Sequence, residues 1–239
     1  CRTLMSYETL SWLFTPFRKA RRCWSTTHDA CSTPWISRTR PKRSGWASSA
    51  WHCAAWRAAQ AGLDPDRLVF LDETWVKSNM TPGYGWGPTH KRVVEAVPHG
   101  HWKTITFVAA LRADGLFAPL VVDGPVNGDL FRAYVEQHLA PALRAGDILV
   151  MDNLPSHKVA GVAAAVKRAG ATLVYLPPYS PDLNPIEQVF AKAKGEIRRR
   201  KPRTVADTET LCGDALDWFP PAECRNYIRH AGYGPQGSN

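Results

Sequence analysis

Two short apolar runs in this sequence each end directly at an aspartate. Leu-Val-Phe-Leu precedes Asp72, and Ile-Leu-Val-Met precedes Asp152. A continuous apolar run of this length, bounded by charged residues, is typical of a strand that is buried on both faces. We therefore predict strands over residues 67–74 and 147–153, within a sheet that helices cover on both sides.

The rest of the chain after Trp56 alternates short apolar runs with amphipathic segments. Further strands are predicted over three ranges: 102–111, 116–124 and 172–177, the first two joined by the hairpin signal Arg-Ala-Asp-Gly. Helices are predicted over four ranges with helical spacing of apolar residues: 128–143, 157–170, 184–200 and 205–219. This order combines a hairpin with parallel crossovers. It predicts an α/β fold, a three-layer domain built on a mixed five-stranded sheet.

The first 56 residues have a different texture. They hold six of the ten tryptophans, and after a stretch that fits one helix (MSYETLSWLF) no period of 3.6 or 2 persists. Residues 1–60 carry ten Lys and Arg against two acids, whereas residues 61–239 carry 20 against 19. Almost all of the net charge of +9 therefore lies at the start of the chain. We predict an irregular basic segment over 1–56 and a folded domain over 57–235.

Several classes of protein are excluded by composition. No run of 18 apolar residues could span a membrane, and the start of the chain lacks the zones of a signal peptide. The six cysteines are scattered without CxxC pairs, which argues against a zinc site or a disulfide scaffold. Unpaired cysteines suit a reducing cytoplasm.

Three acids form the candidate site. If the strands that end at Asp72 and Asp152 are parallel neighbours, both carboxylates emerge at the carboxyl edge of the sheet, where α/β proteins bind ligands. Neighbouring carboxylates raise one another's pKa, and a divalent cation such as Mg²⁺ or Mn²⁺ removes that penalty. Glu187 lies on the shoulder of the apolar stripe of its helix, with Lys194 and Arg198 on the same face.

Each acid also has a purely structural interpretation. Asn184 and Glu187 fit a capping box at a helix start. Asp72 could be an ordinary strand-end acid, and Asp152 could belong to a turn. Asp123 ends a similar apolar run, but the Gly-Pro that follows favours a turn, so we leave Asp123 out of the site.

The motifs around these acids resemble those of a known family. FLDETW, MDNLPSHK and LPPYSPDLNPIEQVFAKAKGEIR are similar to the three acidic motifs of IS-630-type insertion-sequence transposases, in the Tc/mariner superfamily. Thirty-four residues separate Asp152 from Glu187, the interval characteristic of that group. The resemblance covers about residues 57–235. It implies a ribonuclease H-like DDE endonuclease domain, with Asp72, Asp152 and Glu187 as catalytic residues and metal ligands.

The same resemblance implies a function. A transposase of this type cleaves DNA at transposon ends and joins the freed strand to target DNA by two-metal phosphoryl transfer, with two Mg²⁺ or Mn²⁺ ions per active site. It implies TA target sites, a homodimer in the synaptic complex, and a place in the bacterial cytoplasm at the nucleoid. Two alternatives stay open: a catalytically idle DNA-binding remnant of a transposase, and another ribonuclease H-like nuclease.

Residues around the acids carry further expectations. Four basic residues are candidates for DNA contact: Lys158, Lys194, Arg198 and Arg199. His157, next to Lys158, either touches a phosphate or starts a helix in solvent. Trp75 and Trp86 are expected to pack in the core or a loop rather than to stack on bases. Glu73 should point to the face of the sheet opposite Asp72.

The N-terminal segment departs from the family pattern. Transposases of this type usually carry helix-turn-helix modules before the catalytic domain. Residues 1–56 are expected to be a remnant of such a module, or a module read in a shifted frame. With no amphipathic face, this segment should add little to the stability of the fold.

Overall fold

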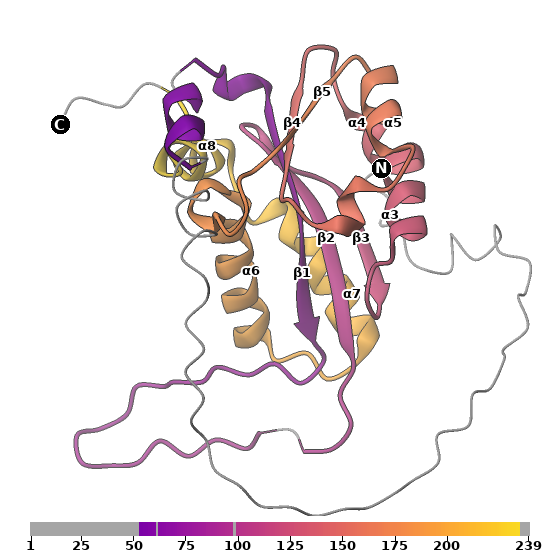
Figure 1. The fold of residues 1–239 in the computed structure, drawn as a ribbon. Helices are drawn as coiled ribbons and strands as arrows, with labels where there is room; N and C mark the ends of the chain where they lie inside the picture. Colours follow the sequence, from indigo (N-terminus) through magenta and orange to yellow (C-terminus); the bar gives the residue numbers. More distant parts are fainter. Residues whose placement is uncertain (1–52, 61, 98, 235–239) are drawn as a thin grey trace, which may run out of the picture.

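The computed structural model describes residues 53–60, 62–97 and 99–234. Its centre is a sheet with the strand order β3-β2-β1-β4-β5 (Figure 1). The strands are β1 (Leu68–Lys77), β2 (Thr104–Arg112), β3 (Gly115–Asp123), β4 (Ile148–Met151) and β5 (Thr172–Tyr175). The predicted five-stranded sheet is thus confirmed, with strand ends shifted by a few residues.

The sheet is mixed, as the order of elements along the chain predicts. β1, β2 and β3 form an antiparallel meander, whose second turn lies at the predicted hairpin signal. β4 pairs with β1 in parallel, and β5 pairs with β4 in parallel. The two strands whose apolar runs end at Asp72 and Asp152 are therefore parallel neighbours, which is the arrangement that the candidate site requires.

Helices cover both faces of the sheet (Figure 1). One face carries α6 (Ile186–Arg200), α7 (Val205–Asp214) and α8 (Pro221–His230). The other face carries α3 (Gly128–Tyr134), a π-helical turn (Val135–Leu139), α4 (Ala140–Ala142) and α5 (Val162–Arg168). The predicted helix over 128–143 is therefore confirmed, with a π-helical turn in its middle.

Side chains along β1 point alternately to the two helical layers. Leu68 and Phe70 pack against α6 and α8, whereas Val69 and Leu71 pack against α3 and α5. Because all four side chains are fully buried, the apolar run has no polar face. The burial places the first half of β1 in the middle of the molecule and leaves Asp72 at the edge of two cores.

Two predicted helices differ from the structure. The helix over 157–170 is wrong in its first third: a 3-10 turn at Pro155–Lys158 comes first, and α5 begins only after Gly161, whose φ is +103°. Only glycine adopts this φ readily, so the break follows from local chemistry that the apolar spacing does not record. The helix over 205–219 ends as an α-helix at Asp214, and α8 was not expected from the pattern.

The start of the described chain is helical over residues 53–60, as the sequence WRAAQAGLD indicates. The predictions for residues 1–52, including the helix over MSYETLSWLF, lie outside the described residues. Within residues 53–234, no helix combines the length and the apolar character that crossing a bilayer would demand.

Candidate active site

Asp72 and Asp152 lie next to one another where the pairing of β1 with β4 ends, Asp72 within β1 and Asp152 directly after β4. The parallel register runs from Leu68 opposite Ile148 to Leu71 opposite Met151, and each aspartate follows directly. Asp72 is buried, with 7% of its surface exposed, and Asp152 is half-buried. The sequence prediction of a parallel pair that brings the two acids together is confirmed, but only Asp152 follows the end of its strand, since β1 continues past Asp72 to Lys77.

Asp72 is held by two hydrogen bonds. The backbone N–H of Glu73 donates to Oδ1 at 2.8 Å, and the side-chain amide of Asn184 donates to Oδ2 at 2.8 Å. Burial, followed by the negative charge of Glu187, raises the pKa of Asp72 to about 8. The charges of Asp152 and Glu73 act in the same direction, so Asp72 lies within a cluster of negative charge.

Asp152 is held by His157. Nδ1 of His157 lies 2.5 Å from Oδ1 of Asp152, and Nε2 lies 2.8 Å from Oε2 of Glu73. The imidazole is fully buried and stacks on Phe131, with 4.4 Å between ring centroids. Burial alone would lower the pKa of His157, but the contacts with Asp152 and Glu73 raise it to about 10. The ring of His157 thus lies between two carboxylates and contacts both.

This position corrects both sequence interpretations of His157. A fully buried ring that faces Asp152 and Glu73 neither contacts a phosphate nor starts a helix in solvent. Glu73 does point to the face opposite Asp72, as its alternation along β1 predicts, and it meets His157 there. Sequence reasoning considered His157 and Asn184 but missed their contacts with the aspartates.

Glu187 lies in the first turn of α6 with an exposed side chain. No side-chain hydrogen bond caps the start of this helix, and Asn184 donates to Asp72 instead of closing a capping box. The structural interpretation of Asn184 and Glu187 is therefore wrong for this chain.

The three acids line one cleft of about 540 Å³. Its walls come from the middle of β1, the segment after β4, the loop before α6 and the first turn of α6: Asp72, Glu73, Asp152, Asn153, Leu154, Pro155, residues 176–181, Asn184 and Glu187. The lining combines carboxylates with proline and leucine. Such a concave site with a few convergent acids suits an anionic substrate only if cations offset the negative charge.

The donor set fits a hard divalent cation. Asp72, Asp152 and Glu187 offer oxygen ligands only, and the pKa of Asp72 is raised first by burial and then by neighbouring negative charge, which a cation would offset. In the described part of the chain, no three or more His, Cys, Asp or Glu side chains are gathered closely enough to form a ready-made metal cluster.

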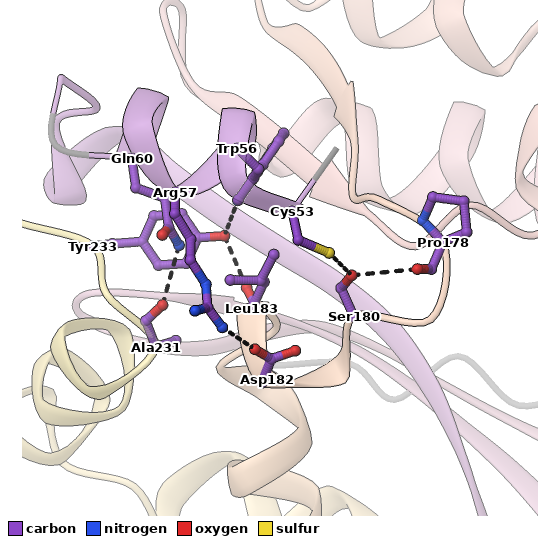
Figure 2. A network of polar contacts seen from close by, with 10 residues as sticks. All are labelled: Cys53, Trp56, Arg57, Gln60, Pro178, Ser180, Asp182, Leu183, Ala231 and Tyr233. Carbon is purple, nitrogen blue, oxygen red and sulfur yellow. Dashed lines mark hydrogen bonds and ion pairs between the residues drawn. The ribbon is translucent and has the colours of Figure 1, made fainter. Parts of the chain in front are cut away.

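Helix 53–60 contacts both the loop that leads into α6 and the segment that follows α8 (Figure 2). Its contacts are Cys53 Sγ to Ser180 Oγ at 3.0 Å, Trp56 Nε1 to Tyr233 Oη at 3.1 Å, Arg57 to Asp182 at 2.7 Å, and Gln60 Nε2 to the Ala231 carbonyl at 3.1 Å. Tyr233 in turn donates to the carbonyl of Leu183 at 2.8 Å. Helix 53–60 and the end of the domain thus brace the loop that carries Asn184 to Asp72.

The four basic candidates lie in different surroundings. Lys194 is half-buried near the acids, since the charges of both Glu187 and Asp72 act on its pKa, which burial lowers overall. Arg198 follows one turn later and repels Lys194. Lys158 is exposed and lies over the ring of Tyr175, and the exposed Arg199 pairs with Glu196. Of the four, Lys194 is the residue on which the charges of Glu187 and Asp72 act.

The two tryptophans expected to pack in the core or a loop do neither. Trp75 is 51% exposed, and Trp86 is fully exposed on the long segment between β1 and β2, which extends away from the sheet (Figure 1). Asp123 forms an ion pair with Lys103 at 2.7 Å on the edge strand β3, which agrees with its exclusion from the site.

Residues 67–212 match the family model described as DDE superfamily endonuclease. The fold is similar to the Mos1 transposase paired-end complex with left transposon end, with a TM-score of 0.63 and 14% identity over 85% of this chain and 64% of that chain. For the Mos1 mariner paired-end complex with Mn, the TM-score is 0.59 and the identity is 15%, over 86% of this chain and 63% of that chain. For the catalytic domain of Mos1 mariner transposase, the TM-score is 0.52 and the identity is 16%, over 82% of this chain and 91% of that chain.

This chain therefore spans less than two thirds of the length of the Mos1 chains in those two complexes. No curated protein is close enough in sequence to be matched with it. At these identities the solved structures establish the fold, a ribonuclease H-like sheet flanked by helices, and the sequence expectation for the fold class is confirmed.

Proposed function

Since the chain belongs to the DDE superfamily endonucleases, we propose that it is a DNA transposase of the IS-630 type, which cleaves DNA at transposon ends and joins the freed strand to target DNA. One observation carries the proposal. Asp72, Asp152 and Glu187, the acids at the family's characteristic spacing, come from three separate elements and line a single cleft at the carboxyl edge of the sheet.

The three carboxylates are the proposed catalytic residues and metal ligands, for two Mg²⁺ or Mn²⁺ ions. When bound, such ions activate the attacking oxygen and stabilise the leaving oxygen of an in-line phosphoryl transfer. One Mos1 paired-end complex was solved with Mn, and another with Mg. For this chain the support is the oxygen-only donor set and the setting of Asp72, whose pKa is raised by burial and by the charge of Glu187.

The other residues of the site orient these acids. Asn184 fixes the carboxylate of Asp72 through its 2.8 Å hydrogen bond, and His157 fixes that of Asp152. Both aspartates still line the cleft. Such supporting contacts hold reacting groups in one orientation, which is a condition for transferring a phosphoryl group in line.

DNA is the proposed partner, both as transposon ends and as target. Lys194 and Arg198 would neutralise phosphates next to the acids, with Lys158 and Arg199 as outer contacts. The Mos1 complexes are described as paired-end assemblies, and a homodimer in the synaptic complex is our proposal for this chain. A bacterial cytoplasmic location at the nucleoid, and TA target sites, belong to the same proposal.

Incubating the chain with supercoiled plasmid and labelled duplex DNA, in Mg²⁺ or Mn²⁺, tests the proposal. Nicking of the plasmid and covalent joining of a labelled 3′ end to it are expected, and Asp152→Asn should abolish both while DNA binding changes little. A chain that binds DNA without cutting it would be an idle remnant. A chain that cuts but never joins would be another ribonuclease H-like nuclease.

A further inference from the structure

Beyond its pairing with β4, strand β1 continues past the acids with one free edge. The parallel register ends at Leu71, so from Asp72 to Lys77 the edge of β1 away from β2 has no strand neighbour within the described residues. Glu73, Trp75 and Lys77 share one side of the strand there.

Two large aromatic side chains are displayed at this edge. Trp75 and Trp102 are each 51% exposed. Trp102 stands just before β2, where Lys77 pairs with Thr104, so the two indoles flank Lys77. Half-exposed indoles next to one another are unusual on a surface without a binding role, because they leave apolar area in water.

Two lysines complete the group. The ammonium of Lys77 lies 5.2 Å from the ring centroid of Trp75 and 5.7 Å from that of Trp102. The ammonium of Lys194, from α6, lies 4.5 Å from the ring of Trp75. We call these four residues the tryptophan–lysine patch.

Lys194 joins the patch to the active site. It lies seven residues after Glu187 on α6, and the charges of both Glu187 and Asp72 raise its pKa against the larger effect of burial. The same side chain therefore contacts an exposed indole and lies close to the acids. A group bound on Trp75 would be adjacent to the reacting phosphate.

We propose that the tryptophan–lysine patch binds one unpaired nucleotide of the DNA strand in the active site, with its base stacked on Trp75 and its phosphate beside Lys77 and Lys194. This inference rests on the proposed function and deepens it. An indole face can stack only on a base that has left the duplex, and such stacking is indifferent to base identity. The contacts of the two lysines with the half-exposed indoles are individually weak, so a phosphate can draw the ammonium groups away from the rings.

Binding of the full chain to fluorescent DNA, followed by anisotropy in EDTA, tests the proposal without any cleavage step. Blunt duplex is compared with the same duplex that carries one unpaired nucleotide at its 3′ or its 5′ end. The wild-type chain should prefer one of the overhang DNAs over the blunt DNA by about tenfold, since stacking of one base contributes about that factor. Trp75→Ala should remove the preference and change blunt-duplex affinity by less than about twofold.

Two controls make the result specific. Trp86→Ala removes another exposed tryptophan, outside the patch, and should keep the overhang preference. An abasic overhang keeps the phosphate but lacks the base. Removing the base should weaken binding by the wild-type chain as much as Trp75→Ala weakens binding to the intact overhang. In the Trp75→Ala variant, removing the base should weaken binding no further. Thermal melting establishes that each variant is folded.

Several outcomes would overturn the inference. Equal affinity of the wild-type chain for blunt and overhang DNA would do so while leaving the proposed function standing. Trp75→Ala and the abasic overhang could also weaken binding independently, so that their effects on the binding free energy add. This result would show that Trp75 does not stack on that base. No binding to either DNA would overturn the inference and the proposed function together.

Discussion

The side-chain amide of Asn184 donates a 2.8 Å hydrogen bond to Oδ2 of Asp72, across 112 residues of sequence. Both groups are buried, so the bond fixes the orientation of the first acid from the loop that leads to the third. The position of this loop is therefore part of the geometry of the acids, and the contacts behind it in Figure 2 become relevant to catalysis.

Replacing Asn184 tests this link. Asn184→Ala should lower metal-dependent DNA cleavage by about 10–100-fold, the range typical for residues that orient metal ligands. Asn127→Ala is a matched control, because Asn127 caps α3 on the other face of the sheet. It should lower stability by about 1 kcal/mol and leave cleavage unchanged. If the two variants lose activity equally at equal stability, Asn184 has no special role.

His157 offers a second prediction, because it bridges two carboxylates. His157→Phe keeps a ring that can stack on Phe131 but removes both donors, so it should lower stability by about 1–3 kcal/mol at pH 6 and lower cleavage strongly. Its pKa rises from 6.5 to about 10 on folding, so its stabilising effect is complete below pH 6.5 and declines as the pH rises toward 10. The melting temperatures of wild type and variant should therefore converge between pH 6.5 and 10. A constant difference over that range would contradict the bridge.

Because Asp72 is a buried acid, its ionisation should lower the stability of the fold. Its pKa rises from 3.8 to about 8 on folding, so the folded state loses stability as the pH rises from about 4 to 8. In EDTA at pH 8, Asp72→Asn should melt a few degrees above the wild type, and the difference should shrink toward pH 5. Added Mg²⁺ should raise the melting temperature of the wild type but not of this variant, if Asp72 binds the cation. A variant that is less stable than wild type at pH 8 would show that Asp72 stabilises the fold instead.

The sequence predicted those features that depend on a local pattern of residues along the chain. Apolar runs predict all five strands, and the acids that end two of them predict the carboxyl-edge site, because a parallel pair aligns its ends. The roles of His157 and Asn184 could not be predicted in this way. Each depends on a contact between residues that are 84 or 112 positions apart. A histidine beside a lysine has the same local pattern whether it is buried against Glu73 or exposed to solvent.

Exposure was equally hard to predict. Trp75 alternates with buried residues along β1, which fits core packing as well as display at a free edge. The short β4 decides between the two, since β4 ends opposite Leu71 and leaves that edge of β1 uncovered. The extent of a neighbouring strand is a property of the sheet and cannot be read from β1 itself.

The last prediction concerns where the folded domain begins. Helix 53–60 contacts the loop before α6 and the end of the domain through Cys53, Trp56, Arg57 and Gln60. Trp56 also packs against the apolar core under α6 and α8. We expect deletion of residues 1–52 to leave the melting temperature within a few degrees, because a basic segment without an apolar period buries little surface. Extending the deletion through residue 60 should lower the melting temperature by roughly 5–10 °C, as apolar burial and four polar contacts are lost. The longer deletion should also reduce cleavage, because the loop that orients Asn184 loses its brace. Melting curves and plasmid nicking of the two truncations check this together. If the shorter deletion already unfolds the domain, residues 1–52 form a genuine part of the fold.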